Sequence, residues 1–308
     1  MTTSPPLAPQ APPRRVDVPA SEGRLRQLEL AVTRKLDGLL HGDHQGLVPG
    51  GGSELADGRP YSPGDDVRRM DWSLTARSGS PHVRTTVADR ELEMWLVVDN
   101  SASLDFGTAN CEKRDHVLAA AAAFGFLTAR DGNRIGALLC GPDGSTVVPP
   151  LSGRGPLLAL LSGLEKRERA PEGAFALAGA LKKARLTARR RSLIVVITDL
   201  MDTGPWDKEL RALAYRHDVV VVEIRDPRET ELPPVGLLTL VDPETGRRLE
   251  VQTANAKVRA RFAEAAAAQV TAKERAVKAA GAGHLVLSTD RDWMLDVVRF
   301  VARRRRRR

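Results

Sequence analysis

Residues 96 to 107 read LVVDNSASLDFG, an apolar run that stops abruptly at a carboxylate. Oxygen-bearing side chains then recur at every second position, at Asp99, Ser101, Ser103 and Asp105. An uninterrupted apolar run of this length is typical of a strand that is covered on both faces. The pattern therefore predicts a buried strand that ends in a loop able to present several oxygen atoms to one point.

A second apolar run ends in the same way. Residues 193 to 199 read LIVVITD, so Asp199 closes a strand as Asp99 does. In an open α/β sheet, ligands bind beyond the carboxyl ends of the strands, at the point where the strand order reverses. If the two strands are neighbours, we expect Asp99 and Asp199 to converge at that edge.

From Leu92 onward, predicted strands and helices alternate, which indicates an α/β fold with a doubly wound, mostly parallel sheet. An Asp-Gly pair within Cys140–Val148 predicts a hairpin, so one edge strand should be antiparallel. A second small hairpin is expected within Gly236–Gln252. The expected strands are Glu93–Asp99, Arg134–Cys140, Thr146–Pro149, Ser192–Asp199, Asp218–Ile224 and His284–Ser288. The expected helices are Ser21–His41, Glu112–Arg130, Gly155–Lys166, Phe175–Arg190, Trp206–Arg216, Ala254–Ala280 and Arg291–Arg303.

The oxygen-bearing residues have two readings. Mg²⁺ prefers oxygen ligands and keeps several waters, so Asp99, Ser101 and Ser103 could hold it while Asp199 binds a metal-bound water. The alternative is that the two serines cap the following segment and Asp99 accepts hydrogen bonds from backbone amides. The sequence leaves a weak metal site and a site without metal equally open.

The DNSAS stretch followed by a distant strand-terminal TDL resembles the metal-ion-dependent adhesion site of von Willebrand factor type A domains. The resemblance covers roughly Leu92 to Arg303 and implies the strand order 3-2-1-4-5-6. That family usually supplies a third ligand, a threonine, from a turn before a helix. Phe175 stands at this position here, so the resemblance implies a degenerate site with weak Mg²⁺ binding.

A second motif lies upstream, where residues 59 to 77 read RPYSPGDDVRRMDWSLTAR. Its alternating carboxylates and guanidinium groups predict a local knot of ion pairs and hydrogen bonds. We expect this knot to dock the N-terminal segment onto the sheet domain, with Trp72 as the apolar anchor.

The same motif resembles the signature of the bacterial family called domain of unknown function 58, in which a von Willebrand factor A-like domain follows. Met70 stands where isoleucine is usual. Genes of this family often neighbour a MoxR-type AAA+ ATPase, which implies that such an ATPase is the partner. The matching residues are Arg59, Tyr61, Gly64, Asp65, Asp66, Arg68, Asp71, Trp72, Ala76 and Arg77.

The composition limits the remaining possibilities. The net charge is +8, but residues 303–308 are six arginines, so the rest of the chain is nearly neutral and no nucleic-acid groove is expected. Two cysteines form no disulfide framework, and neither a signal peptide nor a membrane-spanning run is evident, which predicts a cytoplasmic protein. We divide the chain into a disordered Pro-rich arm (1–20), a helix with the signature segment (21–91), the sheet domain (92–302) and a poly-Arg tail (303–308).

These observations favour a non-enzymatic protein-interaction module that receives an acidic residue of its partner at the carboxyl edge of the sheet. A metal-dependent hydrolase is an alternative, although the sequence shows no acid or base within reach of Asp99. Binding of an anionic polymer through the basic tail is another. A phosphate-binding P-loop is excluded because no Gly-Lys pair occurs in the chain. A phosphotransferase of the haloacid-dehalogenase type is also disfavoured. Those enzymes carry an aspartate that donates a proton at the position of Ser101, and serine cannot supply that proton.

Overall fold

The computed structural model describes residues 21–40, 56–85, 92–129, 132–168 and 175–306. Its centre is a six-stranded sheet with the spatial order β10-β7-β6-β3-β4-β5. All neighbouring strands run parallel except β4 and β5, which form the expected antiparallel hairpin at one edge. Numbered along the chain, the order reads 3-2-1-4-5-6, as the resemblance implied. The strands are β3 (Glu93–Asp99), β4 (Arg134–Gly141), β5 (Gly144–Ser152), β6 (Leu193–Thr198), β7 (Asp218–Arg225) and β10 (Gly283–Ser288).

The central strands are buried on both faces, as their unbroken apolar sequences predict. All six residues of β6 are buried, and so are Met94 to Asp99 in β3. β3 and β6 pair directly in parallel register, with Val98 opposite Ile197. The residues that follow these two strands therefore leave the sheet side by side at the same edge.

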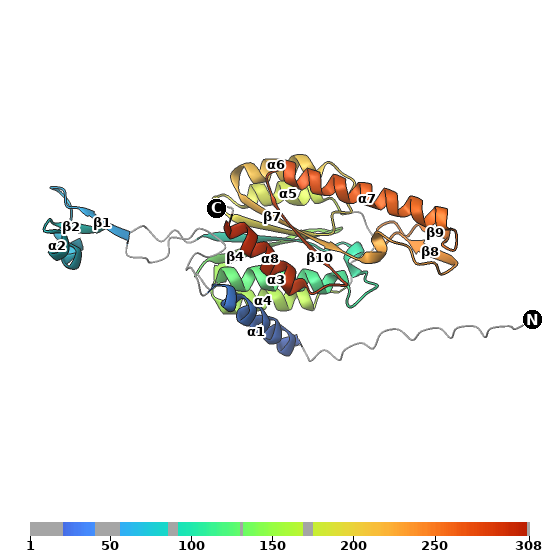
Figure 1. Ribbon diagram of the computed structural model, residues 1–308, viewed down its shortest axis with the longest axis horizontal. Helices are drawn as coiled ribbons and strands as arrows, with labels where there is room; N and C mark the ends of the chain where they lie inside the picture. The colour runs from blue at the N-terminus through green and yellow to red at the C-terminus, as the bar shows by residue number, and fades with distance from the viewer. Residues whose placement is uncertain (1–20, 41–55, 86–91, 130–131, 169–174, 307–308) are drawn as a thin grey trace, which may run out of the picture.

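Helices cover both faces of the sheet (Figure 1). On one face, α3 lies among the side chains of the larger apolar cluster, and its alanine-rich sequence is buried almost throughout. A second apolar cluster fills the other face beneath α5 and α6. The first layer contains α3 (Lys113–Ala129), α4 (Arg154–Glu165) and α8 (Trp293–Arg306), and the second contains α5 (Leu177–Thr187), α6 (Trp206–Arg216) and α7 (Ala256–Ala279).

The N-terminal helix α1 (Ser21–Leu40) belongs to this domain. It packs against α3, α4 and α8, and it buries Leu25 and Val32 in the larger apolar cluster. Glu29 also forms an ion pair with Arg154 at 2.6 Å. The domain boundary expected between this helix and the sheet domain is therefore wrong, because the helix supplies part of the core.

The signature segment forms a small unit of its own, which lies apart from the sheet in Figure 1. The expected docking onto the sheet is not seen there. Trp72 is 68% exposed and anchors nothing, because the unit has little apolar surface to cover an indole ring. The unit contains β1 (Ala56–Pro60), the 3-10 turn Val67–Arg69, α2 (Trp72–Ser78) and β2 (His82–Thr85).

Carboxylates organise this unit by capping. Asp66 accepts a hydrogen bond from the backbone of Arg68 and begins the 3-10 turn. Asp71 accepts from the backbone N–H groups of Ser73 and Leu74 and begins α2. Asp66 and Asp71 thus act as local caps, and Asp65 accepts a hydrogen bond from the backbone N–H of Ser62.

The first arginines of the expected poly-Arg tail belong to a helix. Helix α8 continues to Arg306, so the boundary placed at residue 303 falls inside a helix. Arg304 forms an ion pair with Asp218 at the start of β7 and lies 5.9 Å from the centre of the Phe300 ring. The expected arm at 1–20 lies outside the described residues. The second small hairpin is present as β8 (Leu237–Val241) and β9 (Arg248–Gln252).

Candidate functional site

The four side chains predicted to meet at the carboxyl edge do lie together. Asp99, Ser101, Ser103 and Asp199 are all buried, with between 2% and 6% of their surface exposed. The hydroxyl oxygens of Ser101 and Ser103 are 2.9 Å apart, and Ser103 also hydrogen-bonds to the carboxylate of Asp199. We refer to these four residues as the edge cluster.

Asp99 is held by hydrogen bonds to both of its carboxylate oxygens. The backbone N–H of Ser101 donates to Oδ1 at 2.8 Å, and the hydroxyl of Thr198 donates to Oδ2 at 2.7 Å. Burial and the nearby charge of Asp199 raise the pKa of Asp99 to about 7. Asp99 therefore ties the loop after β3 to the end of β6.

Lys113, which sequence reasoning missed, completes the arrangement. Its side chain is 1% exposed, and its Nζ atom donates to Asp199 Oδ2 at 2.7 Å and to Glu229 Oε1 at 2.5 Å. Burial alone would lower the pKa of Lys113, but the two carboxylates outweigh it and raise that pKa above its usual value. Burial would likewise raise the pKa of Asp199, yet Lys113 holds it below its usual value. The pair is therefore ionised.

The loop after β6 has a strained backbone at the site. Leu200 has a φ of 54°, in the left-handed region that side chains other than glycine rarely adopt. The backbone N–H of Met201 donates to Asp199 Oδ1 at 3.1 Å, so the carboxylate helps to hold this turn. Asp202, one residue further, accepts from the backbone of Leu177 at 2.8 Å and fixes the start of α5.

Phe175, expected at the third ligand position, is buried in the apolar cluster that also contains Leu200. Its backbone N–H hydrogen-bonds to Glu244, in the turn between β8 and β9. Glu244 is also close enough to Asp199 for that charge to raise its pKa, after the larger effect of burial. The β8–β9 hairpin therefore reaches the same edge of the sheet.

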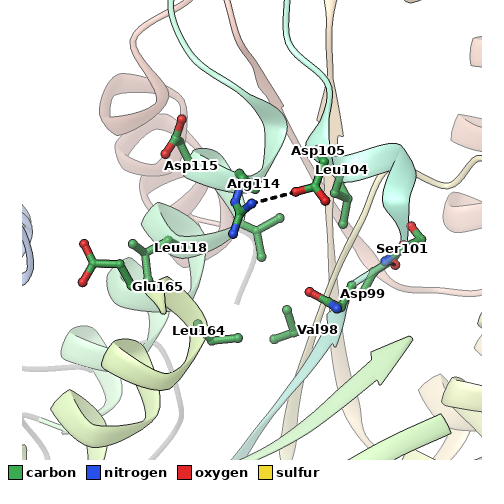
Figure 2. A pocket seen from close by; sticks show the side chains of 12 residues that line it. Val98, Asp99, Ser101, Leu104, Asp105, Arg114, Asp115, Leu118, Leu164 and Glu165 are labelled. Atoms are coloured by element: carbon green, nitrogen blue, oxygen red, sulfur yellow. Dashed lines mark hydrogen bonds and ion pairs between the residues drawn. The ribbon is translucent and has the colours of Figure 1, made fainter. Parts of the chain in front are cut away.

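A pocket of about 50 Å³ lies beside the edge cluster, between the end of β3 and the helices α3 and α4 (Figure 2). Asp99 and Ser101 form one side of it. On the other side, Arg114 forms an ion pair with Asp105 at 3.0 Å, and Glu165 lies nearby. The lining of the pocket mixes carboxylates with a guanidinium group, and its volume is well below the roughly 300–1,000 Å³ of a typical small-molecule site.

Two exposed apolar side chains flank the cluster. Phe106 lies in the loop after β3 and is 40% exposed, and its ring centre lies 5.9 Å from the Lys113 ammonium. Met201, in the loop after β6, is 41% exposed and contacts the Nζ atom of Lys273. Each of the two loops held by the edge cluster thus presents one large apolar side chain to solvent.

The residues as they lie do not fit the Mg²⁺ that an adhesion site implies. All four carboxylate oxygens of Asp99 and Asp199 accept hydrogen bonds from the protein. One of these donors is the Lys113 ammonium, which would repel a divalent cation at Asp199. Within the described ranges, no group of three or more histidine, cysteine or acidic side chains is arranged to hold a metal ion.

The strand order, the helices on both faces and the paired strand-terminal carboxylates define a von Willebrand factor A-like α/β domain. The chain belongs to the family described as "Protein of unknown function DUF58", whose model matches residues 57–272. It is 51% identical over 294 residues to the protein Rv1480 of Mycobacterium tuberculosis, covering 94% of this chain and 92% of that protein. It is 43% identical over 162 residues to the protein MAV169 of Mycobacterium avium, covering 52% of this chain and 95% of that protein.

Solved structures resemble the chain more distantly. BatB from Bacteroides thetaiotaomicron aligns with a TM-score of 0.43 and 16% identity, over 70% of this chain and 99% of that one. An aerotolerance-related membrane protein from Bacteroides fragilis gives a TM-score of 0.44 and 14% identity, over 70% of this chain and all of that one. In the part of this chain that the structure describes, no helix has both the length and the apolar character needed to cross a bilayer.

Proposed function

We propose that the chain is a non-enzymatic protein-interaction module and that its partner docks on the carboxyl edge of the sheet. The observation that carries this proposal is the pair of exposed side chains, Phe106 and Met201, on the two loops held by the edge cluster. Aromatic and methionine side chains are enriched where proteins meet, and they contribute most when a rigid scaffold presents them.

The edge cluster supplies that rigidity. Asp99 links the loop after β3 to Thr198, and Asp199 links the loop after β6 to Lys113 at the start of α3. Loops fixed in this way lose little conformational entropy when a partner binds, which favours affinity. The same bonds make a hydrolase less suitable, because both carboxylates are already engaged and buried rather than directed at a substrate.

The partner that the family resemblance implies is an AAA+ ATPase of the MoxR type. Docking on this edge would leave the signature unit, residues 56–85, free for a second role. Binding of an anionic polymer by the C-terminal arginines is a weaker proposal, because Arg304 already forms an ion pair with Asp218.

The test compares three single variants of the full chain for binding to a purified MoxR-type ATPase encoded in the same genome. Phe106→Ser and Met201→Ser remove the exposed apolar groups. Tyr215→Ser is the control, because it removes a side chain that is 95% exposed near the end of α6, which leads into the amino end of β7 at the opposite edge of the sheet. We expect each of the first two to raise Kd roughly tenfold, as loss of an interface residue worth about 1.4 kcal/mol does. Tyr215→Ser should bind as the parent does. Equal affinities for all four proteins would refute docking at this edge.

A further inference from the structure

We propose that the ammonium of Lys113 takes the place of a divalent cation in the edge cluster. The cluster would then be held together by a cation that belongs to the chain itself, and the loops after β3 and β6 would keep their positions without metal. This goes beyond the docking proposal, and the metal titration that tests it requires no partner.

The position of the ammonium supports this assignment. Nζ of Lys113 lies 2.7 Å from one oxygen of Asp199 and 2.5 Å from one oxygen of Glu229, in a side chain that is 1% exposed. Asp199 in turn accepts a hydrogen bond from Ser103, which is bonded to Ser101. The positive charge of Lys113 is thus linked to the DNSAS loop by hydrogen bonds through Asp199 and Ser103, two of the residues expected around a metal.

The charges of the cluster make the ammonium its counterion. Asp99 and Asp199 lie close enough for the charge of one to disfavour ionisation of the other. A cation is needed at such a site, because unpaired carboxylates are costly to bury. Lys113 meets this need from the first residue of α3, directly after the loop that carries the serines.

A second lysine near the site differs in a way that gives a matched control. Nζ of Lys273 donates to the backbone carbonyl of Asp199 at 3.0 Å, whereas Lys113 bonds to the carboxylate. Lys273 also lies 3.8 Å from one carboxylate oxygen, that of Glu223, but its ammonium does not contact the carboxylate of Asp199 as that of Lys113 does. Removing Lys113 should therefore open a cation position, and removing Lys273 should not.

The experiment measures Mn²⁺ binding by electron paramagnetic resonance and thermal unfolding with EDTA or Mn²⁺. It uses the full chain, Lys113→Ala and Lys273→Ala. A cation at the former Nζ position would have oxygens of Asp199 and Glu229 as ligands, and sites with one or two carboxylates suffice for weak binding. We expect Lys113→Ala to bind one Mn²⁺ with a Kd of about a millimolar or tighter and to gain thermal stability from it. The parent and Lys273→Ala should do neither.

Two further variants guard against a folding defect. Lys113→Gln keeps a hydrogen-bond donor without the charge, so it should fold and also gain Mn²⁺ binding. Adding Asp199→Asn to Lys113→Ala should abolish the gain. Binding of Mn²⁺ to the parent that disappears with Asp199→Asn would overturn the proposal. The proposal would also be overturned if both Lys113 variants fold but do not bind Mn²⁺. The same holds if both are unfolded and do not refold when Mn²⁺ is added.

Discussion

Replacing Lys113 with methionine should destabilise the domain strongly. Methionine fills a similar volume, so the main loss is the charge. At 2.7 Å and an effective dielectric constant of about 20, the attraction between Lys113 and Asp199 amounts to about 6 kcal/mol. Desolvation of the ions offsets much of this gain. Once the lysine is gone, however, Asp199 and Glu229 remain as carboxylates without their counterion, and removal of one partner from a buried pair costs about 3–5 kcal/mol.

The assay is thermal and urea unfolding in EDTA at neutral pH. For a domain of this size, a loss of 3–5 kcal/mol lowers Tm by roughly 6–20 °C. Lys182→Met is the matched control, because Lys182 is exposed on α5 and its replacement should change stability by no more than about 0.5 kcal/mol. If Lys113→Met unfolds at the same temperature and urea concentration as Lys182→Met, the ammonium contributes nothing and its role as the counterion of the cluster is refuted.

Three further perturbations follow from the same geometry. Burial alone would raise the pKa of Glu223, but hydrogen bonds from His284 and Arg225 lower that pKa from its ordinary value of 4.5 to about 2. The resulting stabilisation of about 3 kcal/mol is present above pH 4.5 and is lost as the pH falls towards 2. Urea unfolding across this range should show that loss in the parent and a smaller one in Glu223→Gln. Thr198→Val leaves Asp99 Oδ2 without its donor and should cost about 1–3 kcal/mol by urea unfolding, and an unchanged midpoint would contradict the assigned bond. Arg304→Ala removes one ion-pair partner of Asp218 and should cost up to about 1 kcal/mol, measured as a fall in Tm that Arg303→Ala does not reproduce.

Much of the fold follows from the order of the apolar runs. LVVD and LIVVITD are too short for helices and too uniformly apolar for a half-exposed sheet, so they had to be central parallel strands. Two such strands, each ending in a carboxylate, could be expected to bring Asp99 and Asp199 together, and the structure does so. The hairpin at the β4–β5 edge was likewise marked by its Asp-Gly turn.

The role of Lys113 could not be predicted in the same way. A lysine in the first turn of a helix is normally exposed, and nothing nearby in the sequence marks this one as buried. One of its partners, Glu229, lies 116 residues further along the chain, beyond β7, so only the folded sheet brings the two together. Trp72 shows the opposite error, because a large aromatic side chain suggests burial, whereas here it is exposed on a small separate unit.

The central claim is that a partner docks on the carboxyl edge of the sheet, and hydrogen–deuterium exchange of the full chain with the purified MoxR-type ATPase tests it most directly. We predict slower exchange at residues 100–112 and 199–205 in the complex, with no change around Tyr215 near the opposite edge. The protection should disappear for Phe106→Ser mixed with the same ATPase. Protection confined to residues 56–85, or binding that leaves both loops unchanged, would contradict the account.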